Sequence, residues 1–243
     1  VIMTTGLLPV SVFATGTATK NEWTQGIIDE LTGDGYTLVE DPIPIPNSDL
    51  SYWLVTKLDT TVYPPESDNV IIIVPNSGGG TNFNIPDYTS NDPNLPWGAL
   101  GGVSQVYISD GITGIGDYAF YNLSSIEQIE FEAFKNNVTT IGKYAFSSLT
   151  ADIQFGEAGD GETLDLSGVK ILGESAFAGT SLGCEVILGA DLTAKEDETV
   201  AHKVADSAFQ SCGLTGITFT EPSKITAIGA NAFFGNRSIS SID

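Results

Sequence analysis

A six-residue phrase that occurs five times constrains the fold of this chain more than any other feature. Its first copy is Ile-Gly-Asp-Tyr-Ala-Phe at residues 115–120, and the later copies end on Phe146, Phe177, Phe209 and Phe233. Successive phenylalanines are 26, 31, 32 and 24 residues apart, and periods of this length are typical of solenoids. One such unit cannot bury its apolar face alone, whereas stacked units cover each other. The phrase therefore predicts a stack of repeating units.

The phenylalanines and the alanines that precede them predict two neighbouring columns in this stack. A large residue that always adjoins a small one indicates tight interdigitation at a turn. The second residue of the phrase is Gly in four copies and Ala205 in the fourth. Glycine permits either a positive φ or a close approach of two chain segments. Ala205 indicates that small size alone satisfies this place in the fourth copy.

Short runs with period-two alternation follow most copies and predict short strands. They lie at 129–131, 153–155, 186–188 and 217–219, and 106–108 is the same strand in an incomplete leading unit. Stacked in register, these runs predict a parallel sheet along the array. Because residues i and i+2 of a strand share a face, the outward-facing residues are Gln105, Tyr107, Gln128, Glu130, Asp152, Gln154, Glu185, Ile187, Gly216 and Thr218. If the protein binds a partner, we expect this strip to be the contact surface. The alternative is that the strip is simply a solvated sheet face.

These residues resemble the BspA-like leucine-rich repeats of bacterial surface proteins over about 100–243. The resemblance implies a leucine-rich-repeat solenoid that is mainly β, with stacked short parallel strands and short helical turns. Residues 98–243 would hold about five repeats and a partial leading unit. The family often has Cys three residues after the Phe, and here the five residues at that place are Leu123, Leu149, Thr180, Cys212 and Asn236. The resemblance also implies a secreted or cell-surface protein that adheres to proteins or glycans of a host or neighbouring cell.

The region before the repeats predicts two further parts. Residues 1–14 are largely apolar and resemble the h-region and cleavage site of a secretory signal peptide, although an ordinary edge strand is the alternative. Residues 15–97 predict a small α+β cap on the first repeat, with a helix near 21–33 and strands at 50–56 and 70–74. A separately folded small domain is the alternative. At the other end the chain stops at Asp243 inside a repeat, so we expect a fragment of a longer array or an end covered by a partner copy.

Composition and chemistry favour a binding module. The chain has 31 acidic and 9 basic residues, a net charge of −22, and without a basic patch neither nucleic acid nor an anionic membrane is an expected partner. The sequence has no apolar stretch of about 20 residues, so a membrane-spanning helix is not predicted. We expect Cys184 and Cys212 to be free thiols that pack as small hydrophobes. Together with the single His202, they lack metal-ligand spacing, so no metal or cofactor is expected.

Catalysis is not predicted, because no pair of carboxylates is placed in an evident pocket. Glu127, Glu130 and Glu132 lie close in sequence, but a glycosidase needs two carboxylates at a defined separation across a bound sugar. The insertions at 156–168 and 189–203 predict solvated loops, although solenoid insertions sometimes bind ligands. A non-catalytic adhesin-type module is therefore the main hypothesis. A structural spacer within a longer surface protein is the second hypothesis, and a carbohydrate-processing enzyme is the third.

Overall fold

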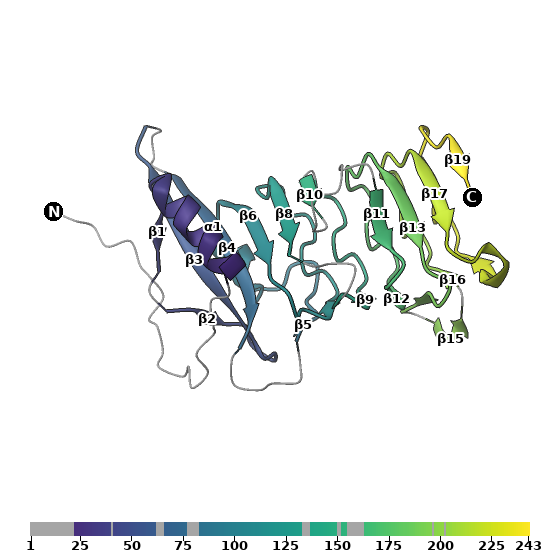
Figure 1. Cartoon of the computed structure of the whole chain (residues 1–243), viewed down its shortest axis with the longest axis horizontal. Helices are drawn as coiled ribbons and strands as arrows, with labels where there is room; N and C mark the ends of the chain where they lie inside the picture. Colours follow the sequence, from purple (N-terminus) through teal and green to yellow (C-terminus); the bar gives the residue numbers. More distant parts are fainter. Residues whose placement is uncertain are drawn as a thin grey trace.

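The computed structural model of the chain describes residues 22–39, 41–61, 66–76, 83–132, 137–149, 152–154, 163–195, 197–201 and 203–243. The predicted signal segment at 1–14, the first half of the 156–168 insertion and His202 lie outside these residues. Figure 1 shows an elongated molecule in which position along the long axis follows position in the sequence. The stack of units that the phrase predicts is therefore the architecture of the described chain.

The predicted repeat strands form one long side of the stack. One sheet has the order β1–β3–β4–β6–β8–β10, with β2 paired to β3, and a four-stranded sheet follows it along the axis. The strands of the first sheet are β1 (Thr37–Leu38), β2 (Ile43–Pro44), β3 (Leu50–Asp59), β4 (Glu66–Pro75), β6 (Val103–Ile108), β8 (Gln128–Phe131) and β10 (Asp152–Gln154). The second sheet has β11 (Thr163–Leu166), β13 (Glu185–Leu188), β17 (Gly216–Phe219) and β19 (Ser241–Ile242). All pairings from β4 through β19 within these two sheets are parallel.

A second side of the stack is built from very short strands that the period-two pattern did not indicate. The Ile, Leu or Val that opens each phrase is the second residue of one of them, so each repeat contributes two strands rather than one. They form a six-stranded sheet of order β15–β14–β12–β9–β7–β5 and a separate pair, β16–β18. Their bounds are β5 (Asn84–Ile85), β7 (Gly114–Ile115), β9 (Thr140–Ile141), β12 (Ile171–Leu172), β14 (Thr193–Ala194), β15 (Asp197–Ala201), β16 (Lys203–Val204) and β18 (Ala227–Ile228).

A ladder of aromatic rings runs through the interior between these sides. The five phrase phenylalanines stack with ring centroids 5.2–5.6 Å apart and planes within 13° of parallel. Trp97, on the short helix α2 (Pro96–Leu100), adds a rung 5.2 Å from Phe120. Its indole Nε1 donates a hydrogen bond of 2.7 Å to the carbonyl oxygen of Ala119. Trp97 therefore takes the place of the phenylalanine in the leading unit.

The phrase glycines are required by close chain approach and not by positive φ. A Cβ on Gly142 would lie 2.5 Å from the backbone nitrogen of Asp117, and one on Gly173 would lie 2.3 Å from that of Lys143. Real Cβ atoms do not come this close to backbone atoms, so each unit rests directly on the unit before it. Positive φ instead occurs two residues later, between 53° and 57°, at Tyr118, Tyr144, Ser175, Ser207 and Asn231. Helical turns in the described array include α2 and the 3-10 helix η1 (Pro222–Lys224).

The residue three places after each phenylalanine ties neighbouring units together in the last three repeats. Thr180 Oγ1 donates to the carbonyl oxygen of Phe146, and Asn236 Nδ2 donates to that of Phe209 over 2.7 Å. Cys212 Sγ makes the equivalent contact with the carbonyl oxygen of Phe177 at 3.0 Å. Hydroxyl, amide and thiol share the ability to donate a hydrogen bond. Cys212 and Cys184 are both free and buried, as the sequence predicts.

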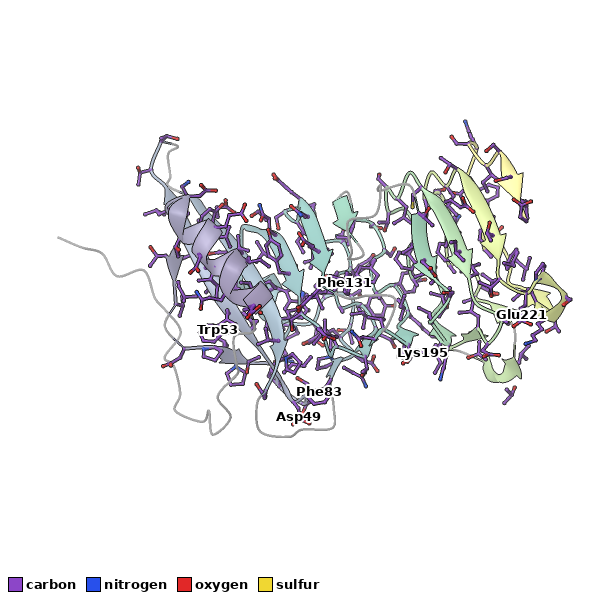
Figure 2. The ribbon with its side chains drawn as sticks, in the orientation of Figure 1. Asp49, Trp53, Phe83, Phe131, Lys195 and Glu221 are labelled. Atoms are coloured by element: carbon purple, nitrogen blue, oxygen red, sulfur yellow. The ribbon has the colours of Figure 1, made fainter. Side chains whose placement is uncertain are left out.

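The N-terminal region extends the repeat sheet and covers part of it. The predicted helix and both predicted strands are confirmed as α1 (Glu22–Gly33), β3 and β4, although the strands are longer than expected. β3 and β4 form an antiparallel hairpin, and β4 pairs in parallel with β6. One face of the hairpin carries Trp53 and Ile72 against Ile28 and Leu31 of α1, and Figure 2 labels Trp53 on this hairpin. Because the other face joins the main core, β4 is apolar on both sides.

Candidate functional site

The predicted outward strip is arranged in two columns along the first sheet. In one column Gln128 of β8 pairs with Gln105 of β6 and with Asp152 of β10. In the other, Glu130 pairs with Tyr107 and Gln154 in the same way. Register therefore brings together the six predicted residues of the first three repeat strands. The side chains that alternate with them on β8, Ile129 and Phe131, are buried in the core, and Figure 2 labels Phe131 in the interior of the stack.

The helix α1 bounds this strip at its N-terminal end. Tyr107 packs partly buried against the cluster under α1 that includes Ile28 and Ile72. Its hydroxyl donates a hydrogen bond of 3.1 Å to Gln105 Oε1. Burial raises the pKa of Tyr107 to about 12, and the nearby carboxylates of Glu130 and Glu30 act in the same direction. Tyr107 therefore fixes the edge of the strip beneath the helix more than it presents a free aromatic face.

Polar side chains next to Tyr107 are already held in place. Gln128 Nε2 donates a hydrogen bond of 3.2 Å to Glu130 Oε2. Burial raises the pKa of Glu130, and repulsion from Glu30 of α1 adds to the shift. A carboxylate that is half-buried beside a like charge is stabilised by an approaching cation or hydrogen-bond donor. This part of the strip is therefore suited to contact a Lys, an Arg or a hydroxyl of a partner.

The second sheet continues the strip with a strand that the sequence did not predict. Ile187 of β13 pairs with Thr218 of β17, and Glu185 pairs with Gly216. On their other side stand Asp165 and Thr163 of β11 respectively, within a segment expected to be a solvated loop. Thr218 Oγ1 donates to Glu185 Oε1 over 2.5 Å. In the described residues no ladder joins β10 to β11, so the strip consists of two sections.

The other insertion makes a long-range contact instead of a free loop. Within it, β14 (Thr193–Ala194) pairs with β12 in parallel and with β15 (Asp197–Ala201) antiparallel. Lys195 then reaches two carboxylates from earlier units, with Nζ 2.7 Å from Asp117 Oδ1 and 3.1 Å from Asp87 Oδ1. The ion pairs raise the pKa of Lys195 despite the opposing effect of its burial. Figure 2 places Lys195 on the side of the stack that the short strands form. The predicted solvated loop is therefore wrong for this insertion.

Reactive groups in the described chain are few and shielded. Burial raises the pKa of the Cys184 thiol to about 11 and that of the Cys212 thiol to about 12, so both stay protonated at neutral pH. No three His, Cys, Asp or Glu side chains among the described residues are grouped to hold a metal ion. Within the same residues no helix is long and apolar enough to cross a membrane.

Comparison with known proteins identifies the repeat. A family model described as BspA type leucine rich repeat region, in six copies, matches residues 99–199 and 161–243. Curated protein sequences give no significant match. Among solved structures, a leucine rich cell surface protein from Faecalibacterium prausnitzii A2-165 is similar at 20% identity and a TM-score of 0.38. The match covers 78% of this chain and 52% of that one, so the chain spans about half the length of this neighbour.

Proposed function

The chain belongs to the BspA type leucine-rich repeat family, and from that membership we propose that it is a secreted or cell-surface module that binds extracellular proteins or glycans without catalysis. The contact surface is the outward strip, defined as Gln105, Tyr107, Gln128, Glu130, Asp152, Gln154, Thr163, Asp165, Glu185, Ile187 and Thr218. Adhesion to a host or neighbouring cell is the biological role that this family membership favours.

The observation that carries the proposal is the register of the repeat strands. It sets polar side chains with a few larger ones in columns, at the regular strand spacing of about 4.8 Å. Such a surface meets a partner with many small contacts instead of one deep pocket, which is how solenoids usually bind. The acidic character of Glu130, Asp165 and Glu185 favours partners with basic or hydroxyl-rich surfaces.

A binding screen with two matched variants tests the proposal. The chain is immobilised and exposed to extracellular-matrix proteins, mucins and glycans by biolayer interferometry, in low and in high salt. Ile187→Ser removes a partly exposed isoleucine from the strip on β13. Ile171→Ser is the control, because Ile171 is also a partly exposed isoleucine but belongs to β12 on the other side of the stack.

We expect saturable binding to at least one ligand, weakened about tenfold by Ile187→Ser, which corresponds to about 1.4 kcal/mol, and unchanged by Ile171→Ser. Affinity for a basic ligand should fall at high salt, since screening weakens contacts between exposed charges. Equal effects of the two variants would contradict the assignment of the strip. No binding across the panel would favour the alternative role, a structural spacer within a longer surface protein.

A further inference from the structure

A cleft outside the outward strip lies where the N-terminal region meets the first repeat turn. It has a volume of about 460 Å³, within the range of about 300–1,000 Å³ that is usual for small-ligand sites. One wall is the turn after β7, with Tyr118, Tyr121 and Asn122. The facing wall is the loop before α2, with Thr89 and Asp92 among its residues.

The tyrosines of this cleft form an ordered aromatic platform. The ring of Tyr118 stacks on that of Tyr144 in the next repeat, with centroids 5.0 Å apart and planes 12° from parallel. Tyr121 meets Tyr118 edge-on, at 5.4 Å and 84°. Tyr144 is absent from the residues that line the cleft, so it supports the face of Tyr118 turned away from the cleft. The platform is thus held from behind and from its edge.

The cleft occupies the position where one more ring of this stack would lie. Tyr88 stands one unit before Tyr118 in the backbone register, because its N–H donates to the carbonyl of Asp117 just as that of Tyr118 donates to Lys143. The ring of Tyr88, however, turns inward and meets Trp97 edge-on at 6.0 Å. The tyrosine stack therefore ends at Tyr118, and the space before it is open.

We propose that this cleft binds a neutral hexopyranose ring of an oligosaccharide, stacked on Tyr118 with its hydroxyl groups bonded to the polar rim. The apolar C–H face of a pyranose packs on an aromatic ring, whose electron-rich face attracts C–H groups. Thr89, Asn91, Asp92 and Asn122 supply both donors and acceptors at the rim. Asp92 Oδ1 is fixed by hydrogen bonds of 2.9 and 3.0 Å from the backbone and side chain of Asn94. These bonds hold the carboxylate in place, so its other oxygen, Oδ2, loses little entropy when it accepts a hydrogen bond from a sugar hydroxyl.

Charge selects a neutral sugar over an anionic one. The residues that line the cleft include Asp92 and no Lys or Arg. The chain as a whole carries a net charge of −22, which repels anions at a distance. Burial raises the pKa of Tyr118, as do Tyr144 and the nearby Asp117. The phenol is therefore neutral at physiological pH and available as a hydrogen-bond partner.

The chain's own repeats supply variants that respect the turn. Tyr118 has φ 56°, and the same turn place holds Ser175 at 55° and Ser207 at 53°. Tyr118→Ser therefore removes the platform and keeps a residue that this turn already accepts twice. Tyr144→Ser is the comparison variant: it removes a ring that lies outside the cleft but supports both cleft tyrosines, stacked on Tyr118 and edge-on to Tyr121 at 6.0 Å, so a smaller loss is expected from it than from a cleft variant. Tyr121→Ala is a second cleft variant, which copies Ala178 at the same place of the third repeat.

The experiment measures saccharide binding by the whole 243-residue chain. Neutral tetrasaccharides of glucose, mannose, galactose and N-acetylglucosamine are tested by saturation-transfer NMR and tyrosine fluorescence, with sialyllactose as the anionic comparison. We expect at least one neutral saccharide to bind. Tyr118→Ser and Tyr121→Ala should each weaken it about tenfold or more while circular dichroism shows that the fold is retained, and Tyr144→Ser should weaken it by no more than about threefold.

Three results would overturn the inference. The first is that no neutral tetrasaccharide binds at about 10 mM. The second is that sialyllactose alone binds. The third is that the wild type and the two cleft variants bind with equal affinity. The strip variant Ile187→Ser should leave saccharide binding unchanged. Because the cleft and the outward strip are altered by different variants, failure of one site does not count against the other.

Discussion

Replacing an interior rung of the aromatic ladder by alanine should remove a large part of the stability of the stack. Phe177 is fully buried, and its ring stacks on Phe146 at 5.2 Å and on Phe209 at 5.4 Å. A buried phenylalanine covers about 150–250 Å², which at about 25 cal/mol per Å² amounts to about 4–6 kcal/mol. Measured Phe→Ala costs of about 3–5 kcal/mol agree. We expect Phe177→Ala to lower the free energy of unfolding by about 4–5 kcal/mol.

The last rung of the ladder provides the matched comparison. Phe233 stacks on Phe209 at 5.6 Å on one side and is only partly buried. Truncation of Phe233 therefore removes one ring contact and less buried area, and we expect Phe233→Ala to cost about 2 kcal/mol, below the range for a fully buried phenylalanine. Both variants and the wild type would be unfolded in urea, with circular dichroism and tyrosine fluorescence as separate probes.

Equal costs for the two positions would refute the reasoning. The stack would then gain its stability from something other than rings packed between two neighbours. A fall in the urea slope together with probe-dependent midpoints would mean that the array comes apart in segments. In that case hydrogen exchange at the flanking repeats should show protection lost on both sides of Phe177 and on one side of Phe233.

The remaining predictions concern the unit interfaces and one acidic group. Gly142→Ala should cost about 1–3 kcal/mol or more, because its Cβ would meet the backbone of the preceding unit at 2.5 Å; thermal unfolding measures this, and a neutral effect would contradict the close approach. Thr180→Val should cost about 1–3 kcal/mol by leaving a buried carbonyl unpaired, while Thr180→Cys, which copies the next repeat, should cost less in the same assay. The raised pKa of Glu130 means that this carboxylate costs the fold stability once the pH has risen above its folded pKa. Glu130→Gln should therefore stabilise the fold at neutral pH. It should not do so below the pKa of an unfolded glutamate, where the carboxyl is protonated in both states. Urea unfolding across pH checks this, with the exposed Glu127→Gln as a control that should show a smaller effect.

Much of the fold could be predicted because the repeat phrase marks its own columns. The repeat period predicts the column of Phe177 and its neighbours, and the alternation of apolar and polar residues predicts the strands around Ile129 and Val186. Both patterns can be recognised in one sequence without homologues. The second strand of each repeat could not be predicted in this way, because two residues are too few to show an alternation. β11 was missed for a related reason, since glycine and acidic residues around Thr163 obscure a four-residue strand.

The candidate sites were less predictable because they depend on contacts distant in sequence. Alternation predicts that Glu130 faces outward, but not that α1 covers Tyr107 beside it. Lys195 contacts carboxylates 78 and 108 residues away, and no local pattern records such a distance. The cleft at Tyr118 was missed because the fourth residue of the phrase differs between repeats. Such a position gives no sign of a binding site until the structure shows which residues surround it.

The stacking of parallel strands across the long axis has a mechanical consequence. A tensile load applied along that axis would act on the ladder hydrogen bonds of one boundary at a time, as in opening a zipper, and not on many bonds in shear. Units of 24–32 residues would then peel off in succession, each releasing about 80–110 Å of chain at about 3.4 Å per residue. Single-molecule extension should show a series of low-force steps of that size, and a single abrupt rupture would contradict it. A tether built in this way absorbs energy by lengthening before it breaks.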